Sequence, residues 1–318
     1  MSIHIINPNL KFGVSCHITD LLNPEYRSYL LKNSHIQALS IYLISENGFS
    51  PVKLTKEQIT SINEFIAVDC LGIYTCIHSC LRYNLCGASK LTNDPKYKSK
   101  KDYVLRGLPE ELDYGVVLNS PVIVHLGVCE YKEQGLKLVS HHITTCLEKI
   151  SPITYLVSQY LSTDELKISQ QEVLRRRKLV LENSAGEKND LGTNIQEIYD
   201  IVKNIPEKYH SQLSLCIDTC HTFAAGLSNF EDEDSVIKLF NDLKKIKIPI
   251  EVIHLNDSKN PYNCKKDRHE ILGKGFIFRS DNGKQALKKL LEIAEKRKIS
   301  LISETPNSDT DWAYIKSL

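Results

Sequence analysis

The chain has 318 residues, a formal net charge of +1 and a hydrophobic content of 42%, which is typical of a globular protein with an ample core. No apolar run approaches the roughly 20 residues that span a bilayer, and the N-terminus lacks the pattern of a secretory signal. We therefore expect a soluble intracellular protein, whether of a nucleus, a bacterial cytoplasm or a viral compartment, that binds no membrane. Any contact with nucleic acid requires a local basic patch.

Eight short runs rich in Val, Ile and Leu recur along the chain, as in buried parallel strands. They lie near Lys11–Ser15, Ile36–Ile44, Leu71–Ile77, Val122–Leu126, Leu179–Glu182, Leu213–Asp218, Ile250–Leu255 and Ser300–Glu304. Helical spacing is found between them, in Lys56–Asp69, Leu136–Lys149, Ile195–Lys203, Asp234–Lys245 and Lys284–Lys298. This alternation predicts an α/β fold, a (β/α)8 TIM barrel, as one domain over residues 1–318 with insertions near 88–120 and 128–178.

Side chains that can bind metal occur at the C-terminal ends of six consecutive predicted strands and in the loops that follow. They are His78, His125, Glu182, Asp218, His221, His254, Asp267, His269 and Glu304. In a parallel barrel all these strand ends open onto one face, where active sites are built. The sequence therefore predicts that the nine side chains converge at one mouth of the barrel.

A single histidine at a strand end is usually a structural residue, and Asp or Glu there often caps the next helix. Nine such residues on one face, including five of the eleven histidines, favour a metal site instead. Imidazole and carboxylate ligands suit zinc, with manganese or iron also possible at some positions. Nine ligands exceed the needs of one ion, so two or three ions with open catalytic positions are expected.

Several longer segments around these residues resemble the signature blocks of the endonuclease IV family. They are Leu181–Gly192 (LENSAGEKNDLG), Cys216–Gly226 (CIDTCHTFAAG), His254–Lys259 (HLNDSK), Asp267–Gly275 (DRHEILGKG) and Glu304–Pro306 (ETP). The blocks occur in family order from about Ile73 to Asn307, and the CIDTCHTFAAG and DRHEILGKG blocks are long and specific. The resemblance implies a TIM-barrel hydrolase with three zinc ions that incises DNA 5′ to abasic sites and leaves a 3′-hydroxyl.

The resemblance also assigns the ligands and the substrate. It implies that His78 and His125 hold the first zinc ion, that Glu182 bridges it to the second, that Asp218, His254 and Glu304 complete the second, and that His221, Asp267 and His269 hold the third. The implied partner is double-stranded DNA with an abasic site or a blocked 3′ end, and members of the family also trim such ends. We expect the protein to act as a monomer.

Three metal ions suit the chemistry of backbone cleavage, which needs a nucleophile at neutral pH, charge neutralisation and a stabilised leaving oxygen. Zinc lowers the pKa of bound water to about 7 and so supplies hydroxide. We expect Glu182 and Glu304 to be catalytic: Glu182 bridges two ions that hold the nucleophile, and Glu304 orients it or accepts its proton as well as binding metal.

Five residues are candidates for contacts with DNA. Leu81 and Arg82 occupy the place where family members often have a Tyr–Leu pair that enters the duplex, so Leu81 is a candidate wedge and Arg82 a candidate stacking or phosphate contact. A solvent-facing pair is the alternative. Lys265, Lys266 and Arg268 flank metal ligands and are candidates for a phosphate clamp.

Three other segments bear on DNA binding. Lys96–Lys101 is expected in a loop over the active face, either on phosphates or simply solvated. The loop Ser45–Pro51 lacks the arginine that family members often insert, and Phe49 is the candidate replacement. Arg175–Lys178 precedes a strand, which predicts a solvated position at the opposite end of the barrel.

Two alternative functions stay open on the sequence. A sugar isomerase or epimerase of the xylose-isomerase type shares the barrel but has no obvious use for a third ligand cluster. A DNA-binding module without activity is the other, although the intact ligand set argues against it. The ten cysteines contain no C-x-x-C pair, and most are expected to be free thiols.

Overall fold

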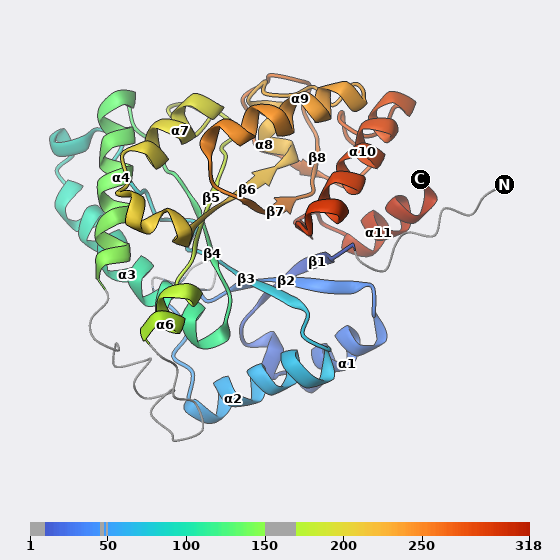
Figure 1. The fold of residues 1–318 in the computed structure, drawn as a ribbon, viewed down its shortest axis with the longest axis horizontal. Coiled ribbons are helices and arrows are strands. Elements are labelled where there is room, and N and C mark those ends of the chain that lie inside the picture. The colour runs from blue at the N-terminus through green and yellow to red at the C-terminus, as the bar shows by residue number, and fades with distance from the viewer. Residues whose placement is uncertain (1–9, 45–47, 49, 150–169) are drawn as a thin grey trace.

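Eight parallel strands close into a barrel in the computed structural model, which describes residues 10–44, 48, 50–149 and 170–318 (Figure 1). The strands are β1 (Phe12–His17), β2 (Ile36–Tyr42), β3 (Tyr74–His78), β4 (Val122–His125), β5 (Leu179–Glu182), β6 (Leu213–Asp218), β7 (Ile250–His254) and β10 (Ser300–Ser303). Around the barrel their order is β1, β10, β7, β6, β5, β4, β3, β2. The predicted TIM barrel is therefore confirmed.

Helices surround this barrel on the outside, as Figure 1 shows. They are α1 (Pro24–Lys32), α2 (Lys56–Glu64), α3 (Tyr97–Leu118), α4 (Lys132–Glu148), α6 (Gln170–Arg176), α7 (Ile195–Lys203), α8 (Thr219–Ala224), α9 (Glu233–Leu243), α10 (Asp281–Arg297) and α11 (Ser308–Ser317). The predicted helix over Lys56–Asp69 ends as an α-helix at Glu64 and continues as one π-helical turn, Phe65–Asp69. In the described part of the chain, no helix is long and apolar enough to cross a membrane.

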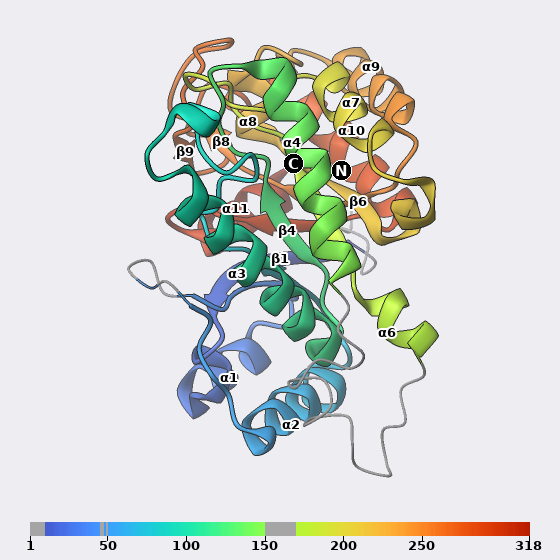
Figure 2. The ribbon, with the colours of Figure 1, turned by 90° about the vertical axis from the view of Figure 1, so that its left-hand side faces the viewer.

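Most of the predicted insertion at residues 88–120 is the long helix α3, which lies beside α4 on the outer surface (Figure 2). Lys96–Lys101, expected in a loop, forms the cap and first turn of this helix. The lysine-rich start carries no apolar periodicity, and Gly107 and Pro109 discourage a helical prediction further along. Gly107 is required because a Cβ there would collide with the hydroxyl of Tyr83. In the second insertion, residues 150–169 lie outside the described residues.

The prediction that Arg175–Lys178 is solvated is wrong for Arg177, whose side chain is 1% exposed. Its guanidinium forms an ion pair with Asp113 of α3 and donates a hydrogen bond to the carbonyl oxygen of Cys146 in α4 at 3.1 Å. A buried charge is tolerated when it is paired in this way. Arg177 thus joins α6 to two helices that precede it in the chain.

The barrel interior has a middle layer of buried side chains that determines the positions above it. Its members are Ala38, Cys76, Ile123, Val180, Cys216, Val252 and Ile302, all 0% exposed. Side chains alternate along a strand, so the residue two positions later also points into the barrel, one layer nearer the C-terminal face. On six strands that residue is one of the predicted metal ligands: His78, His125, Glu182, Asp218, His254 and Glu304.

Candidate metal centre

Two histidines and one carboxylate form a first group at the ends of β3, β4 and β5. The Nε2 atoms of His78 and His125 lie 3.6 and 3.2 Å from Oε2 of Glu182. The Nδ1 atom of His78 lies 3.0 Å from the carbonyl oxygen of Ser79. A proton on Nδ1 is held by that carbonyl, so the Nε2 lone pair is directed at the carboxylate.

A second group shares Glu182 with the first and lies at the ends of β6, β7 and β10. Nδ1 of His254 is 2.9 Å from Oε1 of Glu182, 3.1 Å from Oε2 of Glu304 and 4.0 Å from Oδ2 of Asp218. Glu182 therefore presents one oxygen to each group. This is the arrangement of a carboxylate that bridges two ions.

The third group comes from helix α8 and from the loop of a short antiparallel hairpin, β8 (Asp257–Ser258) with β9 (His269–Glu270). Asp218 caps α8 by accepting a hydrogen bond from the backbone N–H of His221 at 2.7 Å, so the D-x-x-H spacing places both side chains at the rim. The hairpin brings in Asp267, whose two carboxylate oxygens lie 3.1 Å from Nε2 of His221 and 3.1 Å from Nε2 of His269.

The donor set and its spacing fit zinc. Four ligand atoms at the usual zinc distances stand about 3.3 Å apart in a tetrahedron, close to the separations within each group. Of the buried side-chain atoms that have no hydrogen-bond partner within the described part of the chain, four belong to this centre: Oε2 of Glu182 and Nε2 of His221, His254 and His269. Buried polar atoms are nearly always partnered, so these atoms are arranged for a ligand such as a metal ion. The nine residues would hold three ions in overlapping groups.

Charge at the centre also favours cations. Burial lowers the pKa of His269, but the carboxylates of Asp218 and Asp267 outweigh it and raise the pKa to about 9. Burial raises the pKa of Glu182, yet His125 and His254 hold it well below its usual range. The metal-free site thus retains protons on histidines beside ionised carboxylates, and divalent cations would replace those protons.

Sequence reasoning missed two residues that hold the ligands. The Tyr42 ring stacks on His78 with centroids 4.9 Å apart, and its hydroxyl donates to Oε1 of Glu304 at 3.4 Å. Asn256 donates to Oδ2 of Asp218 at 2.6 Å and accepts from the backbone N–H of Glu304 at 2.9 Å. Alternation was the signal: Tyr42 lies two positions after the inward Ser40, and Asn256 two after His254.

Two thiols also lie within ligand reach, Cys216 beside Glu182 and His254, and Cys220 beside Asp218 and His269. Burial raises the pKa of Cys216 to about 12, so in the metal-free protein it is a neutral thiol and not a ready metal ligand. All ten cysteines are free, as the sequence predicts for most of them, and eight are buried.

The candidate DNA-contacting residues lie in different settings around the centre. Leu81 is 63% exposed and lines, with Arg82, Tyr42 and His78, a hollow of 590 Å³ beside the first group. Arg82 is exposed as well. Phe49, the candidate for the loop after β2, lies outside the described residues.

The three basic residues of the β8–β9 loop differ in how free their side chains are to bind a phosphate. Arg268 lines a hollow of 410 Å³ next to His221 and lies 3.3 Å from Oε1 of Glu187. Lys266 is exposed. The Nζ of Lys265 is already engaged, because it donates to the carbonyl oxygen of Ala225 at 2.5 Å. Of the proposed clamp, Arg268 and Lys266 are therefore the better placed.

Residues 67–314 match the family model described as the xylose isomerase-like TIM barrel. A probable endonuclease 4 from Sulfurihydrogenibium sp. (strain YO3AOP1) is 32% identical over 204 residues, which cover 62% of this chain and 67% of that relative. The apurinic-apyrimidinic endonuclease 1 of Plasmodium falciparum (isolate 3D7) is 28% identical over 286 residues, 88% of this chain. The chain spans only 41% of the length of that Plasmodium relative.

Among solved structures, endonuclease IV from Thermus thermophilus superposes with a TM-score of 0.68 at 18% identity, over 96% of this chain and 97% of the other. At that identity the likeness shows the shared fold alone. The family match covers more than three quarters of the chain, and the Sulfurihydrogenibium relative adds a sequence match over two thirds of its own length. The chain therefore belongs to the xylose isomerase-like TIM barrel family and, within it, to the proteins named endonuclease 4.

Proposed function

We propose that the protein is a zinc-dependent endonuclease of DNA repair that hydrolyses the phosphodiester 5′ to an abasic site in double-stranded DNA and leaves a 3′-hydroxyl. Removal of blocked 3′ ends belongs to the same proposal. The observation that carries it is the convergence of nine imidazole and carboxylate side chains in three overlapping groups at one rim of the barrel. The names of the relatives support it.

The two glutamates have different environments and therefore different proposed roles. When bound, zinc lowers the pKa of water and neutralises charge on the phosphate. Glu182 is 1% exposed and presents one oxygen to each of two ligand groups, so it would hold two ions at once. The Glu304 side chain is 12% exposed and is held by Tyr42 and Asn256. Glu304 is thus the carboxylate best placed to orient the attacking water and to accept its proton.

The surroundings of the centre support recognition of a duplex with a missing base. Leu81 is a large exposed apolar side chain beside the first ligand group, which suits insertion into the base stack. Arg82, Lys266 and Arg268 lie around the mouth and would contact DNA phosphates on either side of the abasic site. A local cationic rim of this kind is what a chain of net charge +1 needs in order to bind DNA.

The test is incubation of the full chain with a duplex that carries one abasic analogue at a known position. We expect a single nick on the 5′ side of the analogue. A polymerase should extend the 3′ end that the nick leaves, and no nick should form after treatment with a chelator. Glu304→Ala should retain binding to the duplex and lose cutting. Binding without any nick by the unaltered chain would favour the inactive DNA-binding module, and turnover of a ketose or aldose without nicking would favour the isomerase.

A further inference from the structure

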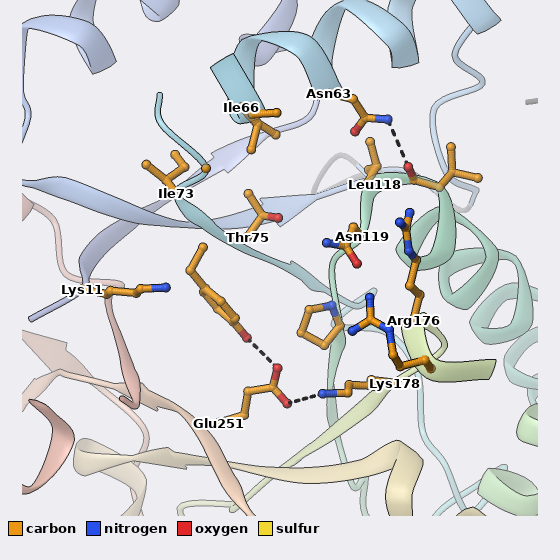
Figure 3. Close-up of a pocket in the computed structure, with 16 residues that line it drawn as sticks. Lys11, Asn63, Ile66, Ile73, Thr75, Leu118, Asn119, Arg176, Lys178 and Glu251 are labelled. Carbon is orange, nitrogen blue, oxygen red and sulfur yellow. Dashed lines mark hydrogen bonds and ion pairs between the residues drawn. The ribbon is translucent and has the colours of Figure 1, made fainter. Parts of the chain in front are cut away.

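A cavity of 560 Å³, drawn in Figure 3, is lined by residues at the starts of the barrel strands. It therefore lies at the opposite end of the barrel from the metal centre. Its walls come from the start of β1 and β3, the π-helical turn after α2, the end of α3 and the residues just before β5. Cavities that bind small molecules usually have volumes of about 300–1,000 Å³. The size therefore suits a small organic ligand.

Basic side chains line this cavity on two sides. Arg176 and Lys178 lie on one side and Lys11 reaches in from the opposite side, as Figure 3 shows, and Arg175 also lines it. Lys11 forms no ion pair with any described residue, and its Nζ stands 5.9 Å from the centre of the Tyr74 ring.

Two carboxylates oppose these four cations. Glu172 pairs with both arginines. Glu251 accepts hydrogen bonds from Ser214 at 2.7 Å and Tyr74 at 3.4 Å, and it lies 3.9 Å from Nζ of Lys178. Counting only the described residues, with Glu172 just outside the lining, the cavity keeps an excess of two positive charges, which matches a dianion.

A further wall of the cavity is apolar with amide groups at its edge. Ile66, Ile73 and Leu118 form the apolar wall. The Asn119 side chain extends into the hollow from the end of α3 (Figure 3). A ligand that fits both the basic and the apolar walls has an anionic end and a flat apolar part with hydrogen-bonding edges.

The middle layer of the barrel separates this cavity from the metal centre. Cys76, Val180, Cys216 and Val252 are each 0% exposed and lie between Tyr74, Ser214 and Glu251 below and the metal ligands above. A molecule in the cavity cannot reach the metals through that layer. The cavity is therefore a site of its own, and DNA bound at the metal face does not occupy it.

We propose that the cavity binds a small phosphate monoester with a flat apolar part, of the nucleoside monophosphate class. Arg176 and Lys178 contact the phosphate, whose oxygens suit the guanidinium fork, and Lys11 adds positive charge from across the hollow, so that the doubly charged form matches the two excess positive charges. The base lies against Ile66, Ile73 and Leu118. A di- or triphosphate would carry more negative charge than the cavity balances.

The test is calorimetric titration of the zinc-loaded full chain with adenosine monophosphate, inorganic phosphate and adenosine at fixed ionic strength. We expect one adenosine monophosphate per chain and at least tenfold weaker binding of phosphate alone and of adenosine. The double variant Lys11→Gln/Lys178→Gln should weaken nucleotide binding at least tenfold and keep the thermal midpoint of the unaltered chain. The matched control is Lys137→Gln, an exposed lysine of α4 paired with Glu133, which should bind the nucleotide normally.

Three results would overturn the proposal: no saturable binding of the nucleotide, equal binding by the double variant, or adenosine binding as tight as that of its phosphate. Equal binding by the double variant would indicate that the phosphate goes to the metal centre. Because the readout is binding and not incision, a chain that failed to cut DNA would still give an answer here.

Discussion

The two ends of the barrel are built from the same strands but differ in chemistry. At its C-terminal end β3 carries His78 and at its start Tyr74, while β7 carries His254 near one end and Glu251 near the other. At the lower end, where the strands begin, polar groups largely form hydrogen bonds with one another, as Glu251 does with Ser214 and Tyr74. At the upper end, where the strands have their C-terminal residues, buried atoms such as Oε2 of Glu182 have no hydrogen-bond partner among the described residues. The strand-end side chains of the upper rim are therefore arranged for metal ions, whereas the polar groups inside the lower end hold one another in place beside the proposed nucleotide cavity.

Removal of the bridging carboxylate should have the largest effect. Glu182→Ala takes one oxygen from each of two ligand groups, so incision of the abasic duplex should fall by at least about 10³-fold and the zinc content should drop by at least one ion per chain. Single-turnover cleavage and elemental analysis measure both. Glu148→Ala, an exposed end-of-helix control on α4, should change neither. Cleavage by Glu182→Ala at the rate of the unaltered chain would show that the upper end is not the site of the chemistry.

Loss of the buried arginine should chiefly affect stability. Arg177→Met removes the guanidinium that forms an ion pair with the buried Asp113, so the free energy of unfolding should fall by about 3–5 kcal/mol. Urea unfolding measures this loss. The double variant Asp113→Leu/Arg177→Met should recover most of it, and the purified single variant should still cut when kept cold. A single variant as stable as the unaltered chain would contradict the structural role of this ion pair.

A pH effect should arise at Glu111 of α3, whose carboxylate accepts a hydrogen bond from the backbone N–H of Cys80 at 3.2 Å. Burial raises the pKa of Glu111 to about 8 from an ordinary 4.5. The folded state thus holds its proton to higher pH than the unfolded chain, so this contribution to stability is complete below pH 4.5 and is lost as the pH rises through 8.

Glu111→Gln should remove that dependence, because glutamine keeps the acceptor oxygen and has no proton to lose. At pH 8 the variant should exceed the unaltered chain in unfolding free energy by on the order of 3 kcal/mol, and at pH 4.5 the two should agree closely. Urea unfolding at both pH values gives the comparison. Parallel pH profiles for the two proteins would show that Glu111 is not held protonated.

The smallest effect concerns the lower end of the barrel. Ser214→Ala removes a buried hydrogen bond to Glu251 and should lower the free energy of unfolding by about 1 kcal/mol. Zinc content and incision should stay within experimental error of the unaltered chain. A loss of zinc in Ser214→Ala would mean that the middle layer does not insulate the two ends.

The barrel and the positions of the strand-end residues could be predicted from the sequence because both follow local rules. Apolar runs mark buried strands, and alternation places the residue at each strand end inside the mouth. The D-x-x-H spacing likewise places Asp218 and His221 on one helix start. All nine predicted side chains are found at one rim, and their function as ligands stays a proposal.

Contacts between distant segments could not be predicted from local patterns. Arg177 finds Asp113 across 64 positions of sequence, so a run of four basic residues gave no sign that one of them is buried. Tyr42 approaches Glu304 from a strand 262 positions away. The first turn of α3 could not be predicted because its lysines show no apolar periodicity. They are helical here because a long helix follows them.

The central claim is that three zinc ions at the upper rim perform the chemistry, and one experiment tests it most directly. The purified chain is analysed for zinc and assayed on the abasic duplex before chelation, after chelation and after zinc is returned. We predict about three zinc ions per chain, incision that disappears with the metal and incision that returns with it. A chain that holds a single ion, or one that cuts equally well when stripped, would contradict the account.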